Sequence, residues 1–358
     1  MTQLQLKPIA LAATAATAAC LITGVALASP VAADKPGSGS SVGTGSVFKV
    51  NPVQSSGDQT LTDQKDSAAA VPASEYAAVE LRNLDGSGRL EGEWVNIRSN
   101  TGPAAYSPTN TFVYQRDDDR FEQVMAYFWV NHAQEYLQSL GFGSTLRPVN
   151  AESQDVRINQ YGLDNSFSWD KHDYIQLGKG GVDDAEDAEV IVHEYGHAVH
   201  DSQVPGFGTT VDAGAIGEAF GDYLAVTVGL DAAQAHGWPV QAPETCVMDW
   251  DATSYTSTVP HCLRRLDTGR VLEDRRNQVH FDGTIWSHAL WDIRQRYLDL
   301  GFTTRDWDRT LIDSQFDYAP GTSFSDAAEA TYLEALANEG PAAADAVRAG
   351  FADRHITF

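Results

Sequence analysis

The sequence predicts an α+β fold of two lobes, with a strand-rich N-terminal lobe over residues 47–205 and a mainly helical C-terminal lobe over residues 206–358. Strand and turn signals dominate between residues 79 and 114. Apolar residues spaced three or four positions apart, which indicate helices, dominate after residue 205. The chain has 358 residues, of which 42% are hydrophobic, so it is long enough to bury one large core or two lobes.

The first 28 residues have the features of a secretory signal peptide. Lys7 gives a positive start, residues 8–28 are apolar, and Ala26-Leu27-Ala28 ends them with the small-x-small pattern that signal peptidase accepts. We therefore expect residues 1–28 to be removed on export. An uncleaved membrane anchor is the alternative, because the apolar run is long. Residues 29–46 are rich in glycine, serine and proline and are expected to form a linker.

The period of the apolar residues predicts the remaining elements. Between Phe121 and Leu140 they recur every three to four positions and stop at Gly141, which indicates a long amphipathic helix. On the same grounds we expect strands at 47–50, 92–97, 156–158 and 174–177, a polar extended loop at 54–76, and helices at 283–300, 324–339 and 341–354.

The most informative motif is His193-Glu194-Tyr195-Gly196-His197. Positions i and i+4 of a helix share one face, so His193 and His197 can direct two imidazoles at one point. A catalytic zinc ion takes three protein ligands and a water molecule, and Glu218 on a second helix can supply the third ligand. Glu194 is then placed to accept a proton from the zinc-bound water.

The segment around Glu218 strengthens the interpretation as a metal site. Asp222 lies four residues after Glu218, where it can accept a hydrogen bond from the second nitrogen of a liganding histidine. The histidine-rich continuation that defines metzincins is absent from the sequence, because Gln203 stands where a further histidine would be needed. His200 is expected to be a partly exposed helix residue and not a ligand.

Charge and cysteine content restrict the class of protein. The net charge of −25 argues against nucleic acid and anionic membranes as partners. Removal of the signal peptide takes away Cys20 and leaves Cys246 and Cys262, which in an exported chain are expected to form a disulfide. Two free thiols in a chain that stays inside the cell are the alternative.

An acidic run, Asp183-Asp184-Ala185-Glu186-Asp187, precedes the motif helix. Carboxylates at this position are favoured by the helix dipole. A Ca²⁺ site is the second interpretation, although calcium needs several converging oxygens and the run is only one local segment.

These segments together resemble the gluzincin metallopeptidases, that is, the thermolysin-like and fungalysin families. Residues 214–222 resemble the glutamate helix of thermolysin-like enzymes, and residues 279–286 resemble the segment whose histidine stabilises the oxyanion. The resemblance implies Zn²⁺ held by His193, His197 and Glu218. It also implies Glu194 as general base and then acid.

The resemblance carries two further roles, and the chain departs from the families in two places. His280 would stabilise the tetrahedral oxyanion, and Asn165 with Ser166 would bind the peptide backbone, with Ser166 standing where the families have alanine. The tyrosine that thermolysin-like enzymes place before the third ligand is not evident in residues 207–212. Glu273 and Asp274 are the nearest candidates for the acid that the families place shortly before the oxyanion histidine.

The sequence therefore predicts a secreted, extracellular zinc endopeptidase that acts on protein or peptide substrates, with no nucleic-acid partner and no membrane association after signal cleavage. A zinc aminopeptidase is one alternative, and it would need an acidic anchor for the free α-amine. A non-catalytic zinc-binding module on a peptidase scaffold is the other, although such a module has no need of Glu194.

Overall fold

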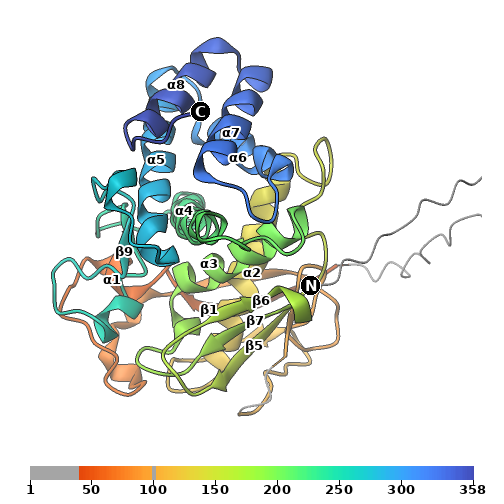
Figure 1. Cartoon of the computed structure of the whole chain (residues 1–358). Helices are drawn as coiled ribbons and strands as arrows, with labels where there is room; N and C mark the ends of the chain where they lie inside the picture. The colour runs from red at the N-terminus through yellow and green to blue at the C-terminus, as the bar shows by residue number, and fades with distance from the viewer. Residues whose placement is uncertain (1–39, 99–101) are drawn as a thin grey trace, which may run out of the picture. The chain divides into compact units, whose positions relative to one another are not determined.

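The computed structural model describes residues 40–98 and 102–358 (Figure 1). The predicted signal peptide over residues 1–28 and the first part of the predicted linker lie outside the described residues. Within them, no helix combines the length and apolar character needed to cross a membrane.

The first sheet of the N-terminal lobe corrects one boundary of the sequence prediction. Strand β1 (Ser41–Phe48) pairs antiparallel with β2 (Tyr76–Leu84) and parallel with β4 (Thr111–Phe112), so part of the expected linker is a central strand. Its glycines serve close packing: a Cβ on Gly45 would lie 2.7 Å from a Val124 methyl carbon. Glycine was therefore a sign of a helix pressed against the strand, and not of a flexible chain.

The second sheet carries the edge that faces the site. Its strand order is β3 (Val95–Ile97), β5 (Gln154–Tyr161), β7 (Tyr174–Gly178), β6 (Phe167–Trp169). The first three run parallel, and β6 is antiparallel to β7 at the edge of the sheet. Strands were expected within β3, β5 and β7, and all three are confirmed, whereas β6 was not predicted.

Two long helices pack against these sheets. Helix α2 (Arg120–Ser139) confirms the helix expected from Phe121, and its buried face includes Trp129. Helix α3 (Ala188–Gln203) carries the histidine motif and packs beside α2. The stretch expected to be an extended loop contains the short helix α1 (Pro52–Ser56) and two 3₁₀ turns.

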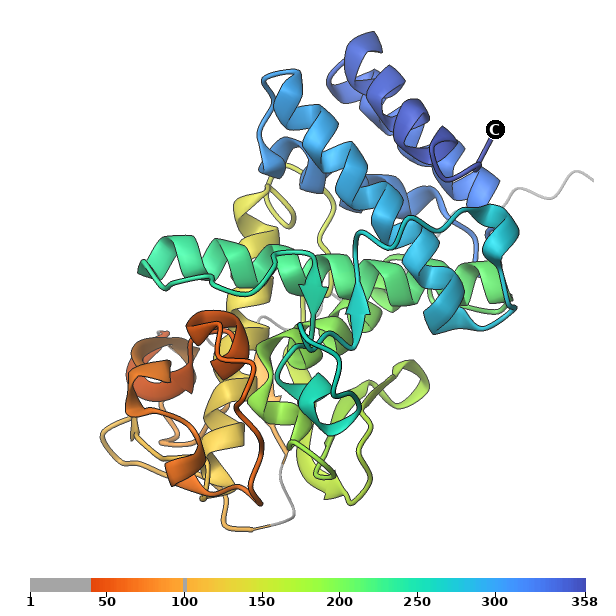
Figure 2. The ribbon, with the colours of Figure 1, turned by 90° about the vertical axis from the view of Figure 1, so that its left-hand side faces the viewer.

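The C-terminal lobe is helical, as predicted. Helix α4 (Val211–His236) packs against α3 on one side and α5 (Val279–Asp299) on the other, and Figure 2 shows it crossing the fold between the strand-rich part and the later helices. Helices α7 (Phe324–Asn338) and α8 (Pro341–Ala352) match the expected spans. Helix α6 (Thr304–Ser314) was not predicted.

A short ribbon lies between α4 and α5. Strands β8 (Cys246–Val247) and β9 (Arg264–Arg265) pair antiparallel, and a disulfide joins Cys246 to Cys262 across the ribbon. The pairing expected from the cysteine count is therefore present.

Candidate metal centre and substrate cleft

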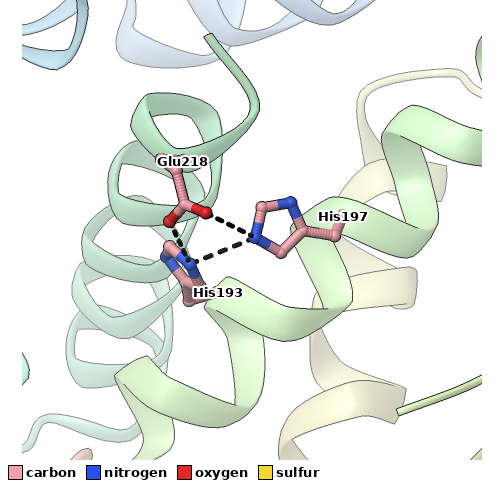
Figure 3. A group of neighbouring side chains, drawn as sticks. All are labelled: His193, His197 and Glu218. Atoms are coloured by element: carbon pink, nitrogen blue, oxygen red, sulfur yellow. Dashed lines mark hydrogen bonds and ion pairs between the residues drawn. The ribbon is translucent and has the colours of Figure 1, made fainter. Parts of the chain in front are cut away.

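The structure brings His193, His197 and Glu218 to one point between α3 and α4 (Figure 3). The Nε2 atoms of the two histidines are 3.2 Å apart. Glu218 Oε2 lies 3.3 Å from His193 Nε2, and Glu218 Oε1 lies 3.9 Å from His197 Nε2. Ligands about 2.1 Å from a tetrahedral zinc ion are separated by about 3.4 Å, so this set of donors fits zinc in both chemistry and spacing.

Two glycines allow the helices to approach closely enough for this arrangement. A Cβ on Gly196 would lie 3.0 Å from the Cα of Gly221, and a Cβ on Gly221 would lie 2.6 Å from His193 Nδ1. A contact of 2.6 Å does not occur for a real Cβ atom, so a side chain at Gly221 would have to displace the ring of His193, whereas the 3.0 Å contact at Gly196 is tight against the backbone of α4. Each glycine lies inside the motif whose ligand it helps to position.

Asp222 lies next to His193, as the sequence predicted. His193 Nδ1 is 2.9 Å from Asp222 Oδ1. The second partner of Asp222 was not predicted: Arg264 donates from Nε and Nη2 to its two oxygens, both at 2.7 Å. A bidentate guanidinium keeps the buried carboxylate ionised and fixes its plane, which orients the imidazole.

The ionisation of the three side chains suits metal binding in different ways. Burial lowers the pKa of His197 to about 4, so its nitrogen lone pair is free. Burial also lowers the pKa of His193, but Asp222 and Glu218 outweigh it and raise the value to about 10. A metal must therefore displace a proton from His193. The pKa of Glu218 is well below its ordinary value, because the neighbouring histidines outweigh its burial.

Glu194 is buried beside this cluster, with 7% of its surface exposed. Burial raises its pKa to about 7, partly opposed by the charge of His193. A carboxylate with this pKa can accept and return a proton near neutral pH.

A cavity of about 340 Å³ connects the cluster to the edge of the second sheet. Its lining includes Glu194, His280 and the three side chains of the cluster, together with Asn165 and Ser166 just before β6. The Ser166 hydroxyl is already engaged, because it donates to Asp184 and accepts from Gly178 N at 3.1 Å. The two residues expected at the substrate edge therefore line the cavity, and Ser166 is held by the lead-in to α3.

His280 lies at the start of α5, with Nε2 3.3 Å from Glu218 Oε2. The sequence suggested an acidic partner, but Asp274 accepts from Val271 N, and Glu273 pairs with His355. The observed partner is Gln278, whose Nε2 is 2.9 Å from His280 Nδ1.

Gln278 also determines which nitrogen of His280 carries the proton. Its Oε1 accepts from Phe281 N as the cap of α5, which leaves its amide nitrogen to donate to His280 Nδ1. The neutral ring then carries its proton on Nε2, the atom that faces Glu218. The position of Gln278 shortly before a predicted helix was the sequence signal that could have revealed its capping role.

The prediction for His200 was wrong. The side chain is 1% exposed and packs between the rings of Phe207 and Phe220, with centroid separations of 4.5 and 4.6 Å. Burial lowers its pKa to about 3, so it is a neutral core residue. The residues that bury His200 include Phe220 of α4, and the residue spacing within α3 alone does not reveal this contact.

The acidic run before α3 does not converge on one point. Asp187 caps the helix by accepting from Glu189 N at 2.9 Å, as the dipole interpretation expects. Glu186 pairs with the buried Arg116 at 2.6 Å, and Asp184 accepts from Ser166. The local run is therefore divided among separate environments.

Comparison with known proteins agrees with this geometry. Residues 160–315 match the model of the family described as Fungalysin metallopeptidase (M36), and this segment contains every site residue from Asn165 to His280. No curated protein matches the chain in sequence. The precursor of protealysin, a metalloproteinase from Serratia proteamaculans, is similar in fold, with a TM-score of 0.55 and 16% identity over 75% of this chain and 89% of that chain. The family match and the shared fold together support a zinc metallopeptidase of the fungalysin and thermolysin-like type.

Proposed function

We propose that the protein is a secreted endopeptidase that hydrolyses peptide bonds at the cluster between α3 and α4. Zn²⁺ would be held by His193, His197 and Glu218. A bound zinc ion supplies Lewis acidity, which polarises a carbonyl and lowers the pKa of water. The observation that carries the proposal is a buried carboxylate, Glu194, with a pKa of about 7 in the same cavity as these ligands.

The side chains of the cavity then divide the proton transfers. Glu194 accepts a proton from the attacking water and returns it to the leaving amine, which its pKa of about 7 permits in both directions. His280 Nε2 donates a hydrogen bond to the carbonyl oxygen as negative charge develops there. Gln278 acts by holding His280 in the tautomer that can donate.

The edge strand supports cleavage within a chain. Among the strands that the structure describes, β6 pairs only with β7, and Asn165 and Ser166 precede it at the cavity. An extended peptide can add to such an edge by backbone hydrogen bonds, which gives no preference for a free terminus. An aminopeptidase is the alternative, and its carboxylate anchor for the α-amine would have to come from the acids beside this edge.

The first experiment tests the catalytic base. Casein cleavage should be lost when a zinc chelator is added, and Glu194→Gln should lower kcat at least a thousandfold, of the order expected when a group that moves both protons is removed. Zinc content, measured by atomic absorption, should be unchanged in the variant, because Glu194 is not among the ligands.

The outcomes separate the alternatives. Equal cleavage by wild type and Glu194→Gln would exclude the assignment of the base, and an absence of cleavage in the zinc-loaded wild type would favour the non-catalytic module. A blocked N-terminus on a synthetic peptide should leave its cleavage unaffected. Products that form only from free N-termini would instead indicate an aminopeptidase.

A further inference from the structure

A second cavity adjoins the cavity of the metal cluster at His280. It has a volume of about 450 Å³ and is lined by β9, by residues that follow this strand, and by the start of α5. His280 lines both cavities, so a single imidazole separates them. A substrate group that extends past His280 can therefore enter this second cavity.

Three arginines line the second cavity, and carboxylates of the protein hold two of them. Arg264 donates to both oxygens of Asp222, and Arg265 donates to both oxygens of Asp267. Arg270, the third, forms no ion pair with a carboxylate in the part of the chain that the structure describes. One guanidinium of the cavity therefore remains available to an anion from outside.

Two contacts hold the side chain of Arg270 at the wall of the cavity. Its Nη1 donates to the hydroxyl of Thr284 at 2.5 Å, and its guanidinium lies over the ring of Phe281, 3.8 Å from the ring centre. Thr284 and Phe281 line the same cavity. Because these contacts order the guanidinium before a ligand arrives, less rotamer entropy is lost on binding.

The electrostatic surroundings of Arg270 also favour an anion. The guanidinium of Arg276 lies over the same ring at 3.9 Å, and it too has no ion pair with a described residue. Burial and the charge of Arg276 lower the pKa of Arg270, despite the opposing charge of Asp274. A bound anion would relieve this repulsion between like charges. Such a site differs in sign from the protein as a whole, which carries a net charge of −25.

We propose that Arg270 binds a carboxylate of the substrate close to the scissile bond, an inference that rests on the proposed function. A guanidinium presents its donors in a planar fork that matches a carboxylate, and Thr284 occupies only Nη1 of this fork. Cleavage within a chain makes an aspartate or glutamate side chain the source of the carboxylate. Arg270 would then determine specificity without contact with the reacting atoms.

Peptides that are blocked at both ends test this preference. Two series differ only in glutamate or glutamine at one position near the cleaved bond. For zinc-loaded wild type, glutamate at one of these positions should raise kcat/KM about tenfold or more, as charge-assisted hydrogen bonds commonly provide. In Arg270→Gln this ratio should fall to about one. A wild-type ratio near one at every position tested would overturn the proposal.

Charge reversal distinguishes a lost contact from a misfolded variant. Arg270→Glu should prefer lysine at the position where wild type prefers glutamate, a gain that misfolding cannot produce. Unchanged preference for glutamate in Arg270→Glu would contradict the assignment.

Arg276→Gln is the matched control. Arg276 carries the same charge on the same aromatic ring but does not line the cavity. The preference for glutamate should therefore persist in Arg276→Gln. Equal loss of the preference in Arg276→Gln and Arg270→Gln would indicate a general effect of charge and not a carboxylate site at Arg270.

Binding measurements separate this proposal from the peptidase proposal. Zinc-loaded Glu194→Gln is expected to bind peptides without cleaving them, so calorimetry can compare its affinities for the glutamate and glutamine peptides. Tighter binding of the glutamate peptide that disappears when Arg270→Gln is added supports the site. If wild type nevertheless cleaves no peptide, only the peptidase proposal fails. Equal affinities for the two peptides would overturn the site, whatever the activity of the wild type.

A free chain end is the other source of a carboxylate. The glutamine peptide is shortened so that it ends at the preferred position, and it is compared as the free acid and as the amide. We expect no advantage for the free acid. An advantage that disappears in Arg270→Gln would support a carboxylate site at Arg270 but would contradict cleavage within a chain.

Discussion

Gly196 and Gly221 are adjacent where α3 and α4 cross, and a Cβ would make a tight contact at Gly196 and a clash at Gly221. The ligands His193 and Glu218 belong to different helices, so their separation depends on the distance between the helix axes. Asp222, the neighbour of Gly221, reaches His193 only because that distance is short. The affinity of the centre for metal is therefore also a property of two residues that cannot bind metal.

Substitution of Gly221 tests this dependence. Gly221→Ala should lower zinc affinity by about 10–100-fold, the range found when the partners of metal ligands are disturbed, because the new methyl group displaces the His193 ring. Affinity is measured by competition with a chromophoric chelator. Gly217→Ala is the control on the same helix, since its Cβ would make an ordinary 3.7 Å contact with His197.

The stability of the control variant should not follow the loss of zinc affinity expected for Gly221→Ala. Alanine is a better helix former than glycine by about 1 kcal/mol, so Gly217→Ala should bind zinc normally and melt no lower than wild type. Equal zinc affinities in the two variants would mean that the glycine contact does not position His193.

The residues of the candidate site were predictable where the signal is local. His193 and His197 share a helix face through a spacing of four, and so do Glu218 and Asp222. The contact between Arg264 and Asp222 was not predictable, because Arg264 lies in a short β-ribbon that has no periodic pattern in the sequence. Gln278 was missed because its role as the cap of α5, which the sequence could have indicated, was not connected with the ring of His280 two positions later.

At the level of elements, the helix α6 shows what pattern alone does not reveal. Its Asp308 is buried and accepts hydrogen bonds from Tyr136 of α2 and Tyr223 of α4, the latter at 2.5 Å. One carboxylate thus joins three helices, and a polar residue on the buried face conceals the helical period in the sequence. Strand β1 was likewise obscured by its glycines, of which Gly45 lets α2 approach it.

Asp308 predicts a dependence of stability on pH. Burial raises its pKa, despite the two tyrosines, above the unfolded value of about 3.9. Its contribution to the free energy of unfolding is then fully present below about pH 4 and is lost as the pH rises through the native pKa. Asp308→Asn, which stays neutral, should therefore gain stability relative to wild type between about pH 4 and pH 7.

Urea denaturation at several pH values measures this difference, and Asp306 on the same helix provides a control of opposite sign. Hydrogen bonds from Thr303 and the charge of Arg309 outweigh burial and lower the pKa of Asp306. Asp306→Asn should therefore lose stability relative to wild type as the pH rises through the acid range. Parallel curves for wild type and Asp308→Asn would contradict the assignment.

For the whole molecule, charge is the property that composition determines most directly. The chain carries a net charge of −25, and self-repulsion of like charges destabilises a compact state. The division into a strand-rich and a helical lobe was also predictable, because it depends only on the period of apolar residues. The strand order of the sheets was not, since pairing partners are set by contacts between distant segments.

Salt should therefore stabilise the protein at neutral pH. Raising sodium chloride from about 0.1 M to about 1 M shortens the Debye length from about 10 Å to about 3 Å and screens the repulsion. The melting temperature should rise by several degrees, as measured by calorimetry. Near pH 4.5, close to the sequence isoelectric point, the same step should have little effect. A rise of equal size at both pH values would point to a general salt effect on apolar burial instead.

The ribbon of β8 and β9 has a consequence for when the centre matures. Arg264 lies two residues after Cys262, whose disulfide with Cys246 closes a ring of about 15 residues. The ring lowers the conformational entropy of the unfolded chain and so stabilises the folded state by ~3 kcal/mol. The oxidation that closes this ring is supplied by the surroundings and not by the polypeptide. A newly made chain in a reducing compartment would hold Arg264 less firmly, so the last hydrogen bonds behind His193 would be completed only where the cysteines become oxidised. The redox state of the compartment would then determine when assembly of the centre is completed.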